Sequence, residues 1–260
     1  MSQPDKKEKK ELTVEQKINR RNFISFSTFI VLGATAFEGW RWLYKSPDEV
    51  PGITGSAHQP LRKALNKTEL FFRRVFSDNH LVKTYPKSMA APHVRVNSNI
   101  GGGKKFDPET WRLQVNKPGA EALQISLDEL KTLPKTEIVY DFKCVEGWDQ
   151  ISHWGGVSFR DFIKHFKLDE FTKMEFVGME TEDKKYYVGL DMPSAMHPQT
   201  LLAYEMNDKP LPIRNGAPLR LIIPVKYGIK NLKQISAISF SNTRPKDYWA
   251  EQGYDYYSGL

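Results

Sequence analysis

Hydrophobic and polar positions follow two different patterns in two parts of the chain. The first pattern, near the N-terminus, is one long apolar run. From Phe23 to Tyr44 the residues are apolar or small, apart from serine, threonine and two charged residues. A helix of about 17 to 25 such residues spans a bilayer. Trp40 and Trp42 cluster with Tyr44 at the far end of the run, as in an interfacial aromatic belt. The pattern predicts a transmembrane anchor over residues 23–44, with a buried core helix as the alternative.

Residues 1–22 form a basic tail in front of this run. The stretch "DKKEKKELTVEQKINRR" has seven basic and four acidic residues, which predicts a cytoplasmic tail with the rest of the chain outside. Arg20 and Arg21, followed by Phe23 and Ile24, resemble a twin-arginine export signal. A simple positive-inside signal is the alternative. Because no small-residue cleavage site follows, we expect an uncleaved anchor.

Residues 45–89 predict a linker and one amphipathic helix. The stretch "KSPDEVPGITGSA" is rich in proline, glycine and serine, which is typical of a linker. In "PLRKALNKTELFFRRVF" a proline opens a helical pattern that places Leu61, Leu65, Phe72 and Phe76 on one face, with basic residues on the other. We expect this helix to pack on the main domain. A helix at the membrane surface is the alternative.

From about residue 90 onward, short alternating segments replace the long run. Alternation predicts strands in "TWRLQVNKPG", "TEIVYDFKCV", "KMEFVGME", "KKYYVGLDM", "PLRLIIPVKYG" and "ISAISFSN". "SLDELKTLP" predicts a helix with Ser126 and Glu129 as a capping box, and "VSFRDFIKHFKL" predicts another after Ser158. Short strands with a few helices between them predict an α+β domain, built on a mixed sheet, over residues 90–260.

Composition and charge narrow the classes of function. The chain of 260 residues has a net charge of +7, but its basic residues are spread along the sequence, which argues against a nucleic-acid partner. A single cysteine excludes an intrachain disulfide. The patterns C-x-x-C, H-E-x-x-H and G-x-x-x-x-G-K-[ST] do not occur, which argues against zinc and nucleotide chemistry.

The lone Cys144 stands in "YDFKCVEGWDQ", at the end of an alternating segment. A buried space-filling thiol, a nucleophile and a metal ligand are the three roles open to it. A nucleophile needs a base, and nothing in the sequence shows that His153 reaches the sulfur. If the strand persists, Glu146 lies on the same side as Cys144, where a carboxylate beside a redox metal can relay protons. An exposed charge at a strand end is the alternative for Glu146.

The residues around this cysteine carry a family resemblance. "CVEGW", the strand before it, the opening "WRLQV" and "SLDELKTLP" resemble the molybdopterin-binding domain of the sulfite oxidase superfamily. The likeness continues in "AYEMNDKPLPIRNGAPLRLIIPVKYGIKNLKQISAISF" and "YWAEQGYD", over about residues 90–257. Within the superfamily, "CVEGW" and "LAYEMNDKPLP" are more similar to the catalytic subunits of bacterial periplasmic protein-methionine-sulfoxide reductases than to sulfite oxidases proper.

The resemblance implies a mono-pterin Mo-molybdopterin cofactor, with Cys144 as the molybdenum ligand and Glu146 beside it. Two stretches are expected to cradle the cofactor: "PHVRVNSNIGGGKK", with polar groups and close backbone approach, and "NGAPLR…VKYGIKNLK", with cations for its phosphate. A solvated side chain is the alternative for each lysine. The expected cofactor contacts, including one just before an expected small helix, are His93, Arg95, Asn97, Asn99, Trp148, His197, Arg220, Tyr227, Gly228, Lys230 and Lys233.

The resemblance also implies oxygen-atom transfer on a sulfur compound, first as reduction of an S-oxide such as methionine sulfoxide. Sulfite oxidation is the alternative, and it needs pocket arginines, for which Arg95, Arg112 and Arg160 are the candidates. A cofactor-free binding module on the same fold is a further alternative. Because one cysteine provides no iron–sulfur ligand set and no haem domain is expected, electrons should come from a membrane cytochrome b or quinone-linked subunit. The expected location is the inner membrane, with the catalytic domain in the periplasm.

Overall fold

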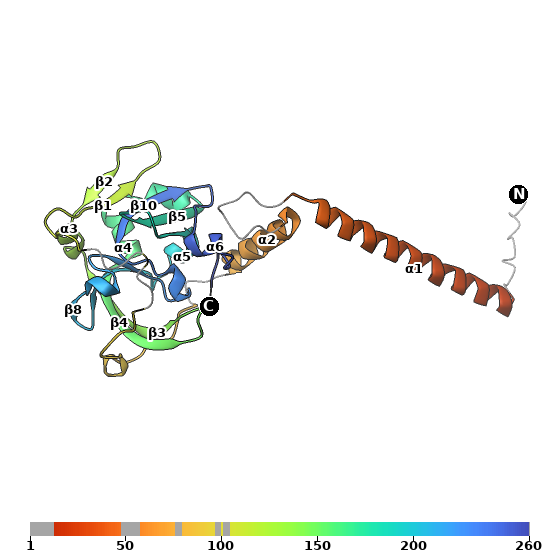
Figure 1. Ribbon diagram of the computed structural model, residues 1–260, viewed down its shortest axis with the longest axis horizontal. Coiled ribbons are helices and arrows are strands. Elements are labelled where there is room, and N and C mark those ends of the chain that lie inside the picture. The colour runs from red at the N-terminus through yellow and green to blue at the C-terminus, as the bar shows by residue number, and fades with distance from the viewer. Residues whose placement is uncertain (1–12, 48–57, 76–79, 97–99, 101–104, 260) are drawn as a thin grey trace, which may run out of the picture. The chain divides into compact units, whose positions relative to one another are not determined.

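A computed structural model of the chain describes residues 13–47, 58–75, 80–96, 100 and 105–259 (Figure 1). The chain divides into two units, Met1–Asp48 with His58–Pro60, and Glu49–Ala57 with Leu61–Leu260. The helices, with short 3-10 turns marked η, are α1 (Val14–Lys45), α2 (Gln59–Val75), η1 (Lys87–Met89), α3 (Leu127–Lys131), α4 (Phe159–His165), η2 (Asp169–Lys173), α5 (Met192–Ala195), η3 (Ile213–Asn215), η4 (Gly228–Lys230) and α6 (Tyr248–Glu251). The strands are β1 (Leu113–Asn116), β2 (Leu123–Ile125), β3 (Lys135–Lys143), β4 (Asp149–Ser158), β5 (Phe176–Thr181), β6 (Tyr187–Asp191), β7 (Leu201–Met206), β8 (Lys209–Pro210), β9 (Arg220–Ile222) and β10 (Ile235–Ser241).

Helix α1 dominates the first unit. The hydroxyl of Thr13 accepts a hydrogen bond from the backbone N–H of Gln16, and the side chain of Gln16 accepts one from the N–H of Thr13, which forms a capping box. None of its described side chains is buried, so large apolar residues such as Phe23 and Phe29 are exposed. Its length and apolar composition are enough to cross a membrane, a property that signal sequences share.

Helix α2 forms as expected, and the large apolar residues described on it are exposed. Leu61 is 47% exposed and Leu65 is 49% exposed, and Phe71 is exposed as well. The side chain of Phe72 and the whole of Phe76 lie outside the described residues. The packing of this helix on the main domain stays a prediction.

Two five-stranded sheets build the second unit. The first has the order β2-β1-β10-β5-β6 and is mixed, because β1 runs parallel to β10 while the other pairs are antiparallel. The second has the order β3-β4-β7-β8, with β9 also paired to β7. In Figure 1 the labels β1, β10 and β5 lie in the upper part of this unit and β3 and β4 in the lower part. The α+β fold with a mixed sheet is confirmed.

The second sheet is buried on both faces. One core joins the two sheets and contains Val115 of β1, Ile238 of β10 and Leu202 of β7. A second core lies on the opposite face and contains Trp154 of β4 and Leu201 of β7. Since neighbouring residues of β7 enter different cores, residues 201–204 are all apolar instead of alternating.

This double burial explains an error of sequence interpretation. The stretch after His197 was expected to form a small helix, but the structure has strand β7 there, and the short helix α5 precedes it. Local signals were reliable elsewhere: Ser126 and Glu129 form the expected capping box of α3, and Ser158 caps α4. A short apolar strand without alternation gives no such local signal, because its pattern also fits a buried helix.

Candidate active site

The tight turn between β3 and β4 carries Cys144. The N–H of Cys144 donates to the carbonyl of Trp148 over 2.9 Å, and the N–H of Gly147 donates to the carbonyl of Cys144 over 3.1 Å. Gly147 has a φ of 83°, a conformation that favours glycine. Cys144 is buried, whereas Glu146 is exposed and accepts a hydrogen bond from Nε1 of Trp148 over 3.1 Å. The strand does not persist past Lys143, so it is the turn that brings Glu146 near Cys144.

Cys144 and Glu146 line one cavity, which encloses about 720 Å³ including its open mouth. A larger depression shares Ile100 with it but lacks the thiol, so we take the cavity of Cys144 as the candidate site. Its described lining consists of Arg95, Ile100, Phe142, Cys144, Val145, Glu146, Trp148, Tyr186, Arg220, Gly228, Ile229, Asn231, Lys233, Trp249 and Tyr254.

Arg220 supplies a buried cation to this cavity. Its guanidinium lies 4.7 Å from the ring centre of Trp154 and 5.5 Å from that of Phe142. Nη1 donates to the carbonyl of Asn215 over 2.8 Å, whereas Nε has no hydrogen-bond acceptor among the described residues. Burial lowers the pKa of Arg220 to about 10, so the side chain remains charged at neutral pH. A buried cation with an unused donor is suited to binding an anion.

Lys233 adds a second cation. Burial, followed by the positive charges of Arg220 and Arg214, lowers the pKa of Lys233 to about 8. An anionic group in the cavity would raise this pKa again, because it stabilises the charged form. The inner wall is therefore electropositive before any ligand is bound.

The loop around η4 lines the cavity and packs against Phe142. A Cβ on Gly228 would lie 2.8 Å from Cε1 of Phe142, so the backbone approaches the ring more closely than a side chain would allow. Asn231 holds this loop in place: its Oδ1 accepts from the N–H of Ile223 over 2.8 Å, and its Nδ2 donates to the carbonyl of Tyr227 over 3.1 Å.

Aromatic residues form the remaining wall. Nε1 of Trp249 donates to the hydroxyl of Tyr186 over 3.1 Å, and that hydroxyl donates to the carbonyl of Ile229 over 2.6 Å. Burial raises the pKa of Tyr186, which keeps the hydroxyl protonated and able to donate. At the mouth, the guanidinium of Arg95 lies 4.6 Å from the ring centre of Trp148.

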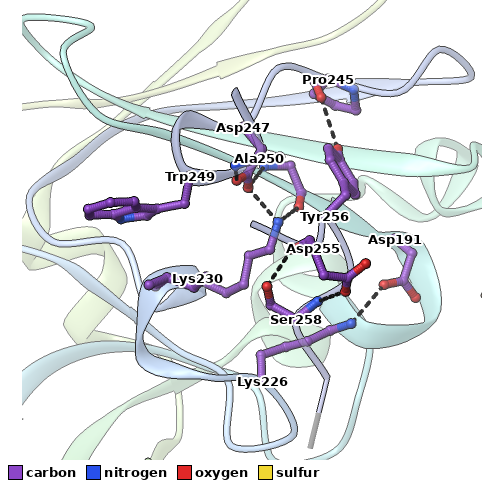
Figure 2. A network of polar contacts seen from close by, with 12 residues as sticks. Asp191, Lys226, Lys230, Pro245, Asp247, Trp249, Ala250, Asp255, Tyr256 and Ser258 are labelled. Atoms are coloured by element: carbon purple, nitrogen blue, oxygen red, sulfur yellow. Dashed lines mark hydrogen bonds and ion pairs between the residues drawn. The ribbon is translucent and has the colours of Figure 1, made fainter. Parts of the chain in front are cut away.

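Lys230 does not line the cavity, although it was expected to contact the cofactor. Its ammonium is buried, 2.5 Å from Oδ2 of Asp247 and 3.1 Å from the carbonyl of Gly189. Figure 2 shows Lys230 reaching Asp247, and Lys226 of the same loop reaching Asp191. These contacts hold the loop around η4 on the side that faces away from the cavity. Lys230 therefore positions the part of this loop that lines the cavity.

Three other expected contacts also lie elsewhere. His93 lines a separate depression, and His197 is buried beside the carbonyl of His80, 3.2 Å from its Nε2. The backbone N–H of Tyr227 donates to the carbonyl of Ser258 over 3.0 Å. The roles expected for these residues stay predictions.

Asn97 and Asn99 lie outside the described residues. The expected contacts that the structure does bring together at the cavity are Arg95, Cys144, Glu146, Trp148, Arg220, Gly228 and Lys233.

Sequence reasoning missed the aromatic and amide members of the lining, Phe142, Tyr186, Asn231, Trp249 and Tyr254. Asn231 and Trp249 fall within stretches that carry the family resemblance, which is the signal that could have identified them. Tyr186 gives no such signal, because only the pairing of β5 with β6 and the packing of α6 bring it to the site.

Comparison with known proteins assigns the fold to a family. The family described as the oxidoreductase molybdopterin binding domain matches residues 100–249, more than half of the chain. The chain belongs to this family. It is therefore an oxidoreductase with a Mo-molybdopterin cofactor, and the alternative of a cofactor-free binding module is set aside.

The chain is also similar in sequence to individual proteins of known name. The chain is 36% identical over 187 residues to YedZ1 of Azospira oryzae, named as a protein-methionine-sulfoxide reductase subunit, covering 71% of this chain and 70% of that protein. It is 34% identical to the catalytic subunit MsrP of Campylobacter jejuni, covering 60% of this chain and 59% of that protein, and 39% identical to MsrP of Xanthomonas axonopodis, covering 56% and 48%. The solved sulfane dehydrogenase SoxCD of Paracoccus pantotrophus matches with a TM-score of 0.49 and 16% identity, over 64% of this chain and 46% of that chain.

The residues of the cavity fit such a cofactor. Molybdopterin carries a phosphate, and the cations Arg220 and Lys233 line the same cavity. A soft metal ligand is present as the Cys144 thiol. The donor set and the charge of the cavity thus agree with the family.

Proposed function

We propose that this oxidoreductase reduces S-oxides, with methionine sulfoxide in proteins as the substrate class, at the cavity of Cys144. The names of the relatives support this reaction. The observation that carries the proposal is the lining of the cavity, where the thiol and a carboxylate lie among aromatic rings, including those of Trp148 and Trp249. Such a lining suits a neutral, partly apolar sulfoxide better than a small dianion.

The alternative reaction, oxidation of sulfite, has less support. Of the three candidate arginines, only Arg95 lines the cavity. Nη1 of Arg112 donates to the carbonyl of Glu109, and Nε of Arg160 donates to the carbonyl of Met196. The cavity therefore offers one arginine at its mouth, with Arg220 deeper inside.

Each cavity residue has a role in this proposal. Cys144, Arg220 and Lys233 would hold the cofactor, the first through its sulfur and the cations through the phosphate. When bound, the cofactor supplies two-electron oxygen-atom exchange with sulfur. Reduction of one sulfoxide consumes two electrons and two protons and yields a thioether and one water. Glu146 is exposed at the mouth, where it can take up protons from solvent and deliver them.

We further propose that α1 anchors the chain in the inner membrane, with the second unit in the periplasm. The apolar helix and the basic residues before it support this orientation. An anchored subunit can receive electrons from a membrane cytochrome b or quinone-linked subunit. A reporter that is active only outside the cytoplasm should be active when fused after Tyr44. An inactive reporter there would contradict the orientation.

The reaction is tested with the full chain purified in detergent from cells that make the cofactor. Molybdenum content is measured first. The protein should then oxidise reduced viologen when methionine sulfoxide in an oxidised protein is added, and should transfer few electrons from sulfite to ferricyanide. Faster turnover with sulfite than with the sulfoxide would reverse the assigned direction.

A further inference from the structure

A second cluster of metal-binding groups lies outside the cavity of Cys144. Glu137 of β3, His153 of β4 and Asp208 of the turn between β7 and β8 each offer one ligand atom, and these atoms lie within 4.8 Å of one another. None of the three residues lines the cofactor cavity. The cluster is therefore independent of the proposed oxygen-atom transfer.

The strand register places these groups together. Val139 lies opposite His153 in the β3–β4 ladder, and Glu137 lies two residues away along β3, on the same face as Val139. Asn207 and Asp208 both have positive φ, as in a type I′ turn. The N–H of Asn207 donates to the carbonyl of His153 over 3.2 Å, which fixes the turn against β4.

The imidazole of His153 is buried with one ring nitrogen unsatisfied. Its side chain is 3% exposed, and its Nε2 has no hydrogen-bond partner among the described residues. Nε2 lies 3.9 Å from Oε2 of Glu137, and Nδ1 lies 3.9 Å from Oδ2 of Asp208. A buried nitrogen without a partner is costly.

A cation already lies between the two carboxylates. Nζ of Lys87 is 2.8 Å from Oε2 of Glu137 and 2.8 Å from Oδ1 of Asp208. An ammonium group has donors and no acceptor, and it makes no hydrogen bond with the imidazole nitrogen. The side chain of Lys87 is 51% exposed, so it can move into water without losing much packing.

We propose that Glu137, His153 and Asp208 form a binding site for a divalent transition-metal ion of the zinc class, which replaces the ammonium of Lys87. One imidazole and two carboxylates are a ligand set that Zn²⁺ accepts, with water completing the coordination. Metal–ligand bonds of about 2.0–2.2 Å require the ligand atoms to approach more closely than they do here. The half-exposed side chains of Glu137 and Asp208 can make that movement, whereas His153 is fixed by burial.

The test is a titration of the full, cofactor-loaded chain in detergent, purified without a histidine tag and treated with a chelator. Zn²⁺ binding is measured by calorimetry, and Co²⁺ binding by its visible absorption. We expect one more ion per chain in the parent than in His153→Gln, or an affinity at least about 10-fold weaker in the variant. Lys87→Met should tighten binding, because it removes the competing cation.

Matched controls separate the site from adventitious binding. His165→Gln changes an exposed histidine on α4 and should bind as the parent does. If His153→Gln does not fold, Asp208→Asn replaces it, since that side chain is 56% exposed and its substitution disturbs no core. Equal stoichiometry and affinity in the parent, His153→Gln and Asp208→Asn would overturn the proposal. So would the absence of binding in both the parent and Lys87→Met.

Discussion

The ammonium of Lys230 lies 2.5 Å from a carboxylate oxygen of Asp247, and both side chains are almost completely buried. Lys230 belongs to η4, beside the cavity residues Gly228 and Asn231. Asp247 caps α6, where Oδ1 accepts from the N–H of Ala250 over 3.0 Å. The ion pair therefore ties together two walls of the cofactor cavity.

Replacing Lys230 with methionine should destabilise the protein strongly. The substitution leaves the carboxylate of Asp247 buried without its cation, which costs about 3–5 kcal/mol of unfolding free energy. Denaturant unfolding of the purified chain measures it. Lys131→Met is the control, because Lys131 pairs with Asp128 over 3.6 Å at the surface and should contribute less than about 1 kcal/mol. Equal losses in the two variants would show that the buried pair does not hold the loop.

Cys144→Ser should separate cofactor binding from turnover. A hydroxyl is a poor ligand for molybdenum, whereas Arg220 and Lys233 remain to hold the phosphate. We expect much of the pterin to be retained, turnover to fall by several orders of magnitude, and the EPR spectrum of the metal to change. If spectrum and activity both match the parent, Cys144 is a packing residue.

Glu146→Gln should keep the metal spectrum and change the rate. The substitution removes a proton carrier at the mouth without touching the sulfur ligand, so the pH–rate profile should shift while cofactor content stays constant. Asp149→Asn is the matched control, because Asp149 is exposed in the same hairpin but does not line the cavity. A parent-like pH profile in Glu146→Gln would remove Glu146 from the mechanism.

Cofactor retention should depend on pH through Lys233. Its pKa is lowered to about 8, so the free cavity loses this charge as pH rises through 8 and its attraction for a phosphate weakens. In the unfolded chain the ordinary pKa is 10.5, so this group makes the cofactor-free protein more stable as pH rises from about 8 to 10.5. The affinity of the cofactor-free protein for the cofactor, measured by equilibrium rebinding, should therefore fall several-fold between pH 7 and 9.5.

Lys233→Arg is the control for that experiment, since arginine keeps its charge over this range. Its affinity for the cofactor should change much less between the two pH values. An affinity that falls equally in the parent and Lys233→Arg would assign the effect to another group.

Local signals account for the elements that the sequence predicted correctly. The capping box of Ser126 and Glu129 and the alternation of β1 lie within a few residues, so they can be recognised without knowing the fold. The glycine, cysteine and cation positions of the site came from long stretches of family resemblance. These positions could therefore be identified without the three-dimensional structure.

The remaining features depend on packing between distant segments. β7 is apolar on both sides because it lies between two cores, and its sequence was interpreted as helical. Lys230 was expected to meet a phosphate, but its charge is matched by Asp247, which a sequence pattern does not reveal. Tyr186 reaches the cavity only because the hydrogen bond from Trp249 and the one to Ile229 join three separate segments.

The parallel pairing of β1 with β10 also sets the order of events during synthesis. Gln114 pairs with Ala237, roughly 120 residues later in the chain. The middle of the first sheet therefore cannot close until β10 has left the ribosome, and contacts of such long sequence separation form late and slowly. The cavity walls extend even further, from Arg95 to Tyr254. A nascent chain thus has no finished binding site for its prosthetic group until the segment that carries Tyr254 has left the ribosome.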